Sequence, residues 1–453
     1  MKKEEQSYLY LVVLHVAIGI AIYLLPFTAK LYGYAMFILG VYYVIKTQNR
    51  NNEALMAAAY IAGAEVLLRM TGGNVSYEFS KYGVMLFILL GMYFSGFSKG
   101  ATPYWFFLVL LVPGVVISSF VLNFDTNIRT TIAFNISGPV CLAVASLYTY
   151  RRKITLEQMN SMLLCIGLPI LSCAVYLTLY TPNIRDVITG TQSNFETSGG
   201  FGPNQVATFL GLGMFIFFSR IILESRSKFL LLLNLIIVLN ISYRGIVTFS
   251  RGGMITGFLM IVLLLSFLYF KSNFRGRVKL NYIVVVIAMA MMVTWTYTSF
   301  QTGGLINKRY ANQDAQGREK ASKFTGRGDI AATEIDMFLD NPVFGVGVAK
   351  GAEVREVETG NFAVSHDEIT RMLAEHGSFG IVGLLILFIT PLVLYLENKF
   401  NLFLLCFLAF WFLTINHAAM RTALPAFVYS LSLLNVQGLP DKKKLVEARQ
   451  NSS

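Results

Sequence analysis

Two arginines lie close together in a segment whose neighbouring residues are mostly apolar. Arg244 and Arg251 are seven residues apart, at the end of a hydrophobic run that begins near Phe229. On one continuous helix they would share a face. A charged side chain at membrane depth is costly and usually functional, although one arginine reaching the headgroups and the other pairing with a buried acid would also explain the pair. Two guanidinium groups on one face would form a site for phosphate or pyrophosphate oxygens.

A histidine is the second candidate for chemistry. His366 precedes an apolar run, in the sequence Ser-His-Asp-Glu at 365–368. An imidazole can accept a proton near neutral pH, as a general base must, and Asp367 or Glu368 could orient it. The same residues also suit a helix N-terminus, with Ser365 as the cap and the two acids on the helix dipole. The two roles are compatible.

Other residue types give little support for further chemistry. His376 precedes a glycine at a membrane boundary, where we expect a structural role, and His417 is predicted to be a loop residue rather than part of an outer polar cluster. The sequence has no HExxH motif, no DxD motif and no Walker loop, so neither a metal site nor ATP hydrolysis is predicted. The four cysteines all lie in apolar segments, which argues against disulfides. We therefore expect no metal and no cofactor.

The elements that must position these residues are membrane spans. Of the 453 residues, 55% are hydrophobic and only 14% are charged, whereas soluble domains carry about 25% charged residues. Apolar residues fall in blocks of about 17 to 23, the length that crosses a bilayer core. We predict an all-α polytopic membrane protein with about 12–14 transmembrane helices. The candidate spans are residues 8–26, 30–45, 54–70, 82–97, 104–121, 131–148, 160–180, 204–222, 229–247, 253–270, 281–299, 373–396, 401–418 and 422–437.

The distribution of lysine and arginine predicts the orientation of these spans. With the N-terminus inside, the inner loops hold 20 of the 37 lysines and arginines, so both termini are predicted to be cytoplasmic. The first apolar run lacks a small-residue cleavage site and is predicted to be a span rather than a signal peptide. This bias, with attraction to anionic lipids, explains the net charge of +12, so nucleic acid is not an expected partner.

Two polar segments fall on the outer side in this layout. Residues 180–203 are rich in Thr, Asn, Ser and Gly, and residues 301–371 form the only long polar stretch. Loops longer than about 15 residues are usually functional or disordered. We expect the long loop to be folded, because it contains a helical pattern at Gly328–Leu339 and a second helix start near Ser365. The predicted organisation is N-terminal spans at 1–180, a central region at 181–400, and C-terminal spans with a cytoplasmic tail at 401–453.

Three motifs in the central region resemble, in their order, the O-antigen ligase and polymerase superfamily. The first is Gly-Phe-Gly-Pro-Asn-Gln-Val-Ala at 200–207, and the second is Ser-Arg-Gly-Gly at 250–253. The third begins at Gly326-Arg327 and contains Asn-Pro-Val-Phe-Gly-Val-Gly at 341–347, His366, and Leu-Ala-Glu-His-Gly-Ser-Phe-Gly at 373–380. Each motif alone is weak evidence for the family. The resemblance is specific because the three motifs occur in the family's order, with the long loop between the spans where the family has it. The first 180 residues match only as hydrophobic spans.

The resemblance implies a metal-independent glycosyltransferase with a GT-C-like fold and short helices in a periplasmic loop. Such enzymes move a glycan from undecaprenyl pyrophosphate to an acceptor hydroxyl on the periplasmic side of the bacterial inner membrane. Arg251 would then hold the pyrophosphate, and His366 would deprotonate the acceptor. Arg244 is a second pyrophosphate candidate, and Arg185 loosely matches a further loop arginine of the family.

Two supporting residues follow from the same resemblance. Asn204 falls in the first motif. Asp367 stands where the family often has asparagine, and an aspartate there could raise the basicity of His366 or indicate a different acceptor. The chemistry also fits the residues by themselves, because fixed guanidinium groups stabilise a pyrophosphate leaving group and a weakly nucleophilic hydroxyl needs a base.

The leading prediction is ligation of O-antigen to lipid A core. A polymerase of the same superfamily, which extends an O-antigen or exopolysaccharide, is the alternative within this class, and a protein acceptor is a third variant. The partners would be an undecaprenyl-pyrophosphate-linked glycan, a lipid A core or glycan acceptor, and membrane lipids. A flippase or transporter of lipid-linked oligosaccharides is the non-enzyme alternative. A transporter usually carries charges along a central path through several spans, whereas these polar residues gather at one face.

Overall fold

The computed structural model describes residues 3–123, 127–320, 327–360, 363–398, 400–418 and 420–437, and these residues are mainly helical. The elements of the first half are α1 (Lys3–Leu24), α2 (Thr28–Thr47), α3 (Glu53–Met70), α4 (Phe79–Ser95), α5 (Thr102–Val121), α6 (Ile128–Thr149), β1 (Lys153–Thr155), α7 (Leu156–Tyr180), α8 (Ile184–Val187), the 3-10 helix η1 (Glu196–Ser198) and α9 (Pro203–Leu223). Those of the second half are α10 (Lys228–Ile246), α11 (Arg251–Lys271), α12 (Phe274–Gln301), α13 (Leu305–Tyr310), α14 (Arg327–Asp340), α15 (Lys350–Thr359), α16 (Glu368–Glu397), α17 (Leu404–Ala418), α18 (Ala423–Leu431) and β2 (Asn435–Gln437).

Many of these helices have the length and composition of membrane spans. Ten helices among the described residues are long and apolar enough to cross a bilayer, and two shorter apolar helices, α4 and α17, bring the number into the predicted range. The prediction of an all-α polytopic membrane protein is therefore confirmed. The long polar loop is folded, because it contains α13, α14 and α15. The helix predicted at Gly328–Leu339 is α14, which extends one residue further at each end.

The last predicted span, residues 422–437, is not a membrane-crossing helix. Its helical part, α18, has nine residues, which gives a length of about 14 Å against a bilayer core of about 30 Å. After α18 the chain turns and forms β2, which pairs in parallel with β1, with Val436 opposite Ile154. The side chains of Asn398 and Asn401 both donate to the carbonyl of Leu434. These polar contacts hold the chain after α18 inside the protein.

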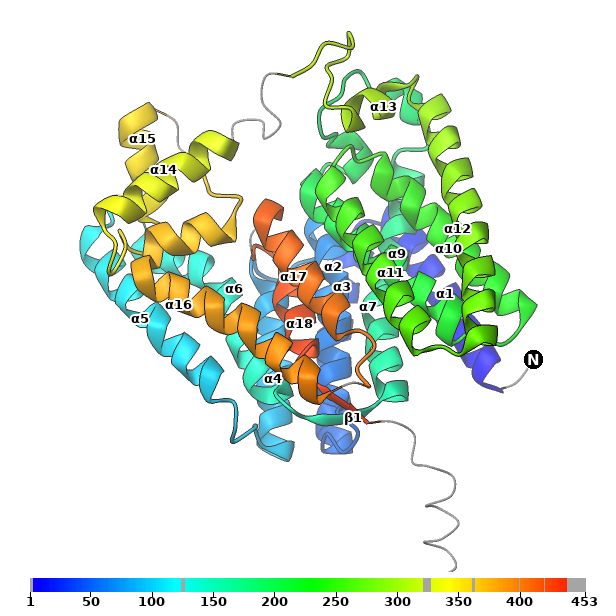
Figure 1. The fold of residues 1–453 in the computed structure, drawn as a ribbon, viewed down its shortest axis with the longest axis horizontal. Helices are drawn as coiled ribbons and strands as arrows, with labels where there is room; N and C mark the ends of the chain where they lie inside the picture. The colour runs from blue at the N-terminus through cyan, green and yellow to red at the C-terminus, as the bar shows by residue number, and fades with distance from the viewer. Residues whose placement is uncertain are drawn as a thin grey trace, which may run out of the picture.

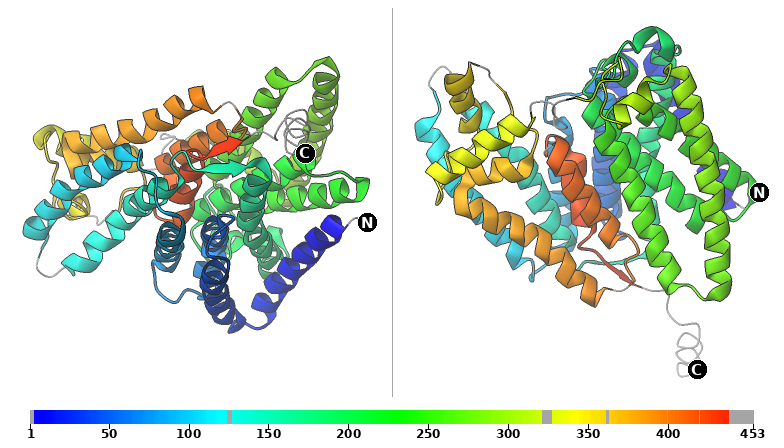
Figure 2. Two further views of the ribbon diagram at one scale, coloured as in Figure 1. Left: turned by 90° about the horizontal axis from the view of Figure 1, so that it is seen from below. Right: turned by 45° about the horizontal axis from the view of Figure 1, so that its top comes forward.

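Two groups of helices stand on either side of a central pair. Helices α17 and α18 lie in the middle, with α5, α6 and α16 on one side and α9 to α12 on the other (Figures 1 and 2). The folded parts of the long loop, α13, α14 and α15, lie at one end of the bundle, and β1 lies at the opposite end (Figure 1). The described helices of the polar loop therefore lie at a single end of the molecule.

Charged side chains inside the bundle are paired, which explains how α3 and α4 tolerate them. Glu65 forms an ion pair with Arg69 at 2.8 Å, and Lys81 forms one with Glu78 at 2.6 Å. The carboxylate of Glu65 also accepts a hydrogen bond from the backbone N–H of Ala423, at 2.7 Å. A carboxylate at a helix N-terminus satisfies donors that have no partner within the helix. The short helix α18 is thereby fixed within the apolar interior.

Glycines allow α9 and α11 to touch along their backbones. A Cβ atom added at Gly253 would overlap the backbone of Ala207 and Thr208, and one added at Gly257 would overlap the carbonyl of Gly211. The spacing of Gly253 and Gly257 is that of the small-residue motifs through which membrane helices approach closely. The contact places the first turn of α11 directly beside α9.

Replacing Gly257 with alanine should destabilise the protein, because the new methyl group must displace the backbone of α9. We expect the free energy of unfolding to fall by about 1–3 kcal/mol, the usual cost of overpacking, measured as a lower melting temperature in detergent. Gly190→Ala is the control, since the space around Gly190 is open. Equal melting temperatures for the two variants would contradict the close contact between α9 and α11.

Candidate functional site

A polar cavity opens at the end of the bundle that carries α13 and α14. Its volume is about 530 Å³, and its walls come from α9, α11, α13, α14, α16 and α17. Four residues that the sequence singled out line it: Asn204, Arg251, His366 and Asp367. We call this space the outer cavity. It brings together side chains that lie up to 224 residues apart in the sequence, from Ser193 to His417.

Arg251 is the first residue of α11, and a break in the chain separates it from α10. Helix α10 ends at Ile246, and Phe249 has a φ of 58°, a left-handed backbone conformation that ends a helix. The hydroxyl of Thr248 stabilises this turn by donating to the carbonyl of Gly245 and accepting from the backbone N–H of Ser250. Arg251 thus begins a new helix whose direction differs from that of α10.

The break puts Arg244 and Arg251 on different helices, so they do not share a face. Arg244 is buried at the end of α10 and donates three hydrogen bonds to α7 and the residue after it, two to Thr178 and one to the carbonyl of Thr181. It does not line the outer cavity. These hydrogen bonds from the Arg244 guanidinium hold the end of α10 against the end of α7.

Arg185 also lies away from the outer cavity. It is exposed on the short helix α8, and its guanidinium carbon is 4.7 Å from the centre of the Phe300 ring. It lines a separate hollow formed by the end of α12 and the start of α13. Of the three arginines predicted from the sequence, only Arg251 faces the outer cavity.

Arg309 is a cavity residue that the sequence analysis did not identify. It lies on the six-residue helix α13, where its guanidinium donates to the carbonyl of Phe249 at 2.9 Å and to the hydroxyl of Ser193 at 3.3 Å. Its own carbonyl accepts a hydrogen bond from Arg251 at 3.3 Å. In the sequence, Arg309 is marked only as one of a pair of basic residues in the polar loop. Its place in the cavity depends on how α13 folds back over the turn before α11, and no motif indicates that fold.

Positive charge gathers on the side of the outer cavity formed by α11 and α13, where Arg251 and Arg309 lie. Within the described residues Arg251 has no carboxylate partner. The pKa of Lys320 lies below its ordinary value, because burial disfavours its charged form and because Arg309 and Arg251 repel a proton there. Burial raises the pKa of Tyr310 on α13, and the same two arginines oppose the shift. Such a cluster favours an anion, since an anion would relieve the mutual repulsion of the cations.

His366 reaches the cavity from the segment before α16. Asp367, rather than the predicted Ser365, is the N-cap of α16, and its carboxylate accepts from the backbone N–H of Ile369 at 2.8 Å. Burial raises the pKa of Asp367 above its ordinary value, an effect that this hydrogen bond opposes. Ser365 instead accepts from the N–H of Asp367 and donates to Glu334 at 3.1 Å. His366 is thus held between a helix cap and a polar anchor.

Glu334 is the anchor that ties this segment to α14. Its buried carboxylate forms an ion pair with Arg355 of α15 at 3.0 Å and accepts hydrogen bonds from Ser365 and Thr370. Arg355 in turn donates to the carbonyl of Ala363. The network therefore connects α14, α15 and α16 around the segment that carries His366.

Asn204 and His417 form the wall of the cavity on the side of α9 and α17. The side-chain oxygen of Asn204 accepts a hydrogen bond from Ser250 at 2.7 Å, which fixes the residue just before Arg251. His417 lies in the last turn of α17 rather than in a loop, with its Nε2 atom 3.2 Å from the hydroxyl of Thr208. His376, by contrast, is buried next to the kink of α16 at Gly377, outside the cavity.

Residues 236–387 match the family model described as O-antigen ligase. This region is similar to the O-antigen ligase family. The predicted resemblance to the O-antigen ligase and polymerase superfamily is thereby confirmed for this third of the chain. No curated protein and no solved structure matches the chain.

The region that matches the O-antigen ligase family supplies most of the cationic and basic groups of the outer cavity. Arg251, Arg309, Glu334 and His366 all fall inside the match, whereas Asn204 and the residues of α17 lie outside it. The cavity is thus completed by helices on both sides of the domain in the sequence. Among the described residues, no group of three or more His, Cys, Asp and Glu side chains is arranged to hold a metal ion.

Replacing Glu334 with alanine should release the segment that carries His366. The change removes the carboxylate from a buried guanidinium, which typically costs about 3–5 kcal/mol. We expect faster amide hydrogen exchange in α14 and in the first turn of α16, measured in detergent by mass spectrometry. Glu356→Ala, at an exposed position of α15, is the control. The anchoring role is contradicted if both variants exchange at the same rate as the unmodified protein.

Proposed function

We propose that this protein is a glycosyltransferase that moves a glycan from undecaprenyl pyrophosphate to an acceptor hydroxyl at the outer face of the membrane. The observation that supports this proposal is that a region similar to the O-antigen ligase family contributes two arginines and a histidine to one cavity. Arg251 and Arg309 suit the pyrophosphate, and His366 suits the acceptor hydroxyl. We place the outer cavity on the periplasmic side of a bacterial inner membrane, with both termini cytoplasmic, because of the charge bias of the short loops.

The reaction requires one bond to form and one to break. The acceptor oxygen attacks the anomeric carbon of the glycan, and the bond between that carbon and the pyrophosphate oxygen breaks. The hydroxyl proton passes to the imidazole of His366, and the lipid pyrophosphate leaves with the electron pair. The leaving group gains negative charge in the transition state, where guanidinium donors held in a fixed position stabilise it most effectively.

The two arginines differ in how much of their hydrogen-bonding capacity is engaged. Arg251 uses one donor for the carbonyl of Arg309, at the long distance of 3.3 Å. A guanidinium has five N–H donors, so Arg251 can still present a fork to pyrophosphate oxygens. Arg309 holds the turn before α11 through Phe249 and Ser193. We therefore assign the main pyrophosphate contact to Arg251 and a supporting charge to Arg309.

We propose lipid A core as the acceptor, because a single long loop late in the chain favours a ligase over a polymerase. A polymerase would use the end of a growing glycan instead, and the same cavity and the same base would serve it. The transporter alternative receives less support, since the cationic groups of the outer cavity lie at one end of the bundle. We also propose that transfer needs no metal, since the arginines supply the charge that a metal would otherwise provide.

The test is transfer by the purified protein in detergent with EDTA present, using an undecaprenyl-pyrophosphate-linked glycan and either lipid A core or free glycan as acceptor. We expect Arg251→Ala to lower the transfer rate by about 10²–10³-fold, because it removes transition-state charge stabilisation. We expect His366→Ala to lower it by about 10²–10⁴-fold, because the base is lost, while donor binding is unchanged.

Arg185→Ala is the matched control for Arg251→Ala, because it removes an arginine of the same predicted face that lies outside the outer cavity. It should transfer at nearly the rate of the unmodified protein. An unmodified protein that transfers glycan to neither acceptor would contradict the proposal and favour the transporter. Transfer to glycan alone would identify a polymerase, and loss of activity on chelation would contradict metal independence.

A further inference from the structure

Arg421 lies in the turn between α17 and α18 and reaches the segment that carries His366. Its guanidinium donates to the carbonyl of Ser365 at 2.5 Å and to the carbonyl of Val364 at 3.4 Å. The carbonyl of Ser365 belongs to the same planar peptide group as the N–H of His366. A charged donor makes such a hydrogen bond shorter and stronger than a neutral donor does. Arg421 therefore fixes the peptide plane directly before His366.

The peptide group after His366 is fixed as well. The hydroxyl of Ser365 accepts a hydrogen bond from the N–H of Asp367 at 3.2 Å. The carboxylate of Asp367 caps α16 through the N–H of Ile369. Because a residue has only two soft backbone dihedrals, φ and ψ, two fixed peptide planes determine the direction of its Cα–Cβ bond. The imidazole of His366 thus enters the outer cavity from a defined point.

The turn that carries Arg421 is itself held from two sides. The backbone N–H of Ala423 donates to the carboxylate of Glu65 on α3 at 2.7 Å, and that of Met420 donates to the carboxylate of Glu368 on α16 at 3.2 Å. Both carboxylates are fully buried, and a hydrogen bond is stronger in such surroundings than in water. The position of Arg421 is thus set by α16 and also by α3, a helix outside the region that matches the O-antigen ligase family.

We propose that Arg421 is a positioning residue for His366, which it holds in the orientation needed to take the proton of the acceptor hydroxyl. This inference rests on the proposed function, in which His366 is the general base. Arg421 is not among the residues that line the outer cavity, so it acts through His366 rather than on the substrates. A base must lie within hydrogen-bonding reach of the proton that it removes. Loss of Arg421 should therefore slow the chemical step and leave substrate binding nearly intact.

Three arginine variants test this role through the kcat and KM of transfer in detergent. Arg421→Met removes the donors and keeps an unbranched side chain, and we expect it to lower kcat by about 10²-fold, the cost of a misplaced catalytic group. The KM values for donor and acceptor should hardly change. Arg421→Lys keeps a charge and N–H donors, so its kcat should fall less. Arg129→Met, at an exposed position of α6, is the control and should keep the unmodified rate.

The same substitutions in a His366→Ala protein separate positioning from a general loss of structure. With the base removed, Arg421→Met should cause little further loss of kcat, because it acts only through His366. An arginine that merely stabilises the fold would lower the rate by the same factor in both proteins, and that result would overturn the proposal. So would a higher KM with an unchanged kcat, which would make Arg421 a binding residue. If Arg421→Met does not fold, Arg421→Lys provides the same comparison.

Amide hydrogen exchange tests the positioning without glycan transfer. We expect Arg421→Met to speed exchange in residues 364–369 relative to the unmodified protein and to Arg129→Met, measured by mass spectrometry in detergent. Equal exchange in the three proteins would overturn the inference. Faster exchange in a protein that transfers no glycan even when unmodified would support the contact of Arg421 with this segment and contradict the transferase. An active enzyme whose kcat is unchanged by Arg421→Met would contradict the positioning role and leave the transferase standing.

Discussion

The outer cavity depends on the backbone contact between α9 and α11. Gly211, Gly253 and Gly257 leave no side chain between the two helices, so the first turn of α11 is fixed against α9. That contact sets Ser250 against Asn204 and thereby orients Arg251, which follows it. It also leaves room beside Gly252 for the imidazole of a neighbouring helix, α17. The cavity is thus defined by the absence of side chains at a helix crossing as much as by the polar residues around it.

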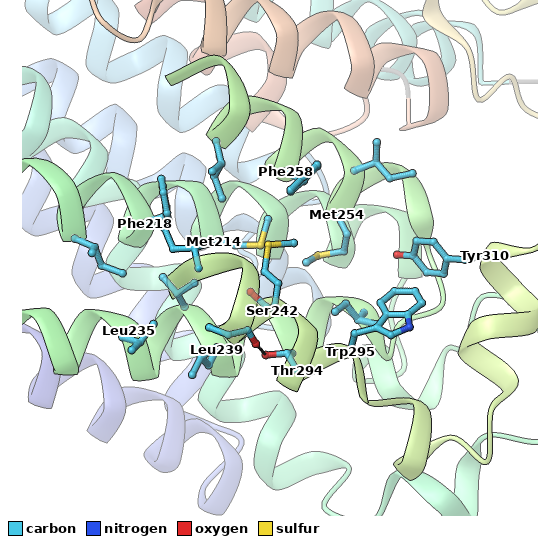
Figure 3. Close-up of a pocket in the computed structure, with 18 residues that line it drawn as sticks. Met214, Phe218, Leu235, Leu239, Ser242, Met254, Phe258, Thr294, Trp295 and Tyr310 are labelled. Atoms are coloured by element: carbon cyan, nitrogen blue, oxygen red, sulfur yellow. Dashed lines mark hydrogen bonds between the residues drawn. The ribbon is translucent and has the colours of Figure 1, made fainter. Parts of the chain in front are cut away.

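The second constraint is the cost of a charge in an apolar protein. For Arg244 this cost is offset by hydrogen bonds to backbone carbonyls at the end of α7. For the acids of α14 and α16 it is offset by ion pairs with Arg355 and Arg371. Arg251 has no carboxylate partner within the described part of the chain and lies where the polar outer cavity meets an apolar pocket lined by α9, α10, α11 and α12 (Figure 3). This boundary is the position that suits an amphipathic donor, because its charged and hydrocarbon parts need opposite surroundings.

The sequence predicted the all-α membrane fold and the folded loop, because long apolar blocks and helix signals depend on local composition. It also singled out residues that the structure places in one cavity, among them Arg251, His366 and Asn204. It did not reveal the break between α10 and α11, which depends on a left-handed Phe249 and a hydroxyl contact within the turn. Arg309 was missed for a related reason, since its position follows from the folding of α13 over that turn rather than from any motif.

The proposed function requires that a lipid-linked pyrophosphate binds at Arg251, with His366 facing the same cavity. The most direct test is an electron cryomicroscopy structure of the protein in lipid nanodiscs with undecaprenyl pyrophosphate bound. We expect pyrophosphate density within hydrogen-bonding distance of the Arg251 guanidinium, and chain density between α10, α11 and α12. Pyrophosphate bound instead at Arg185, with the outer cavity filled only by water, would contradict it.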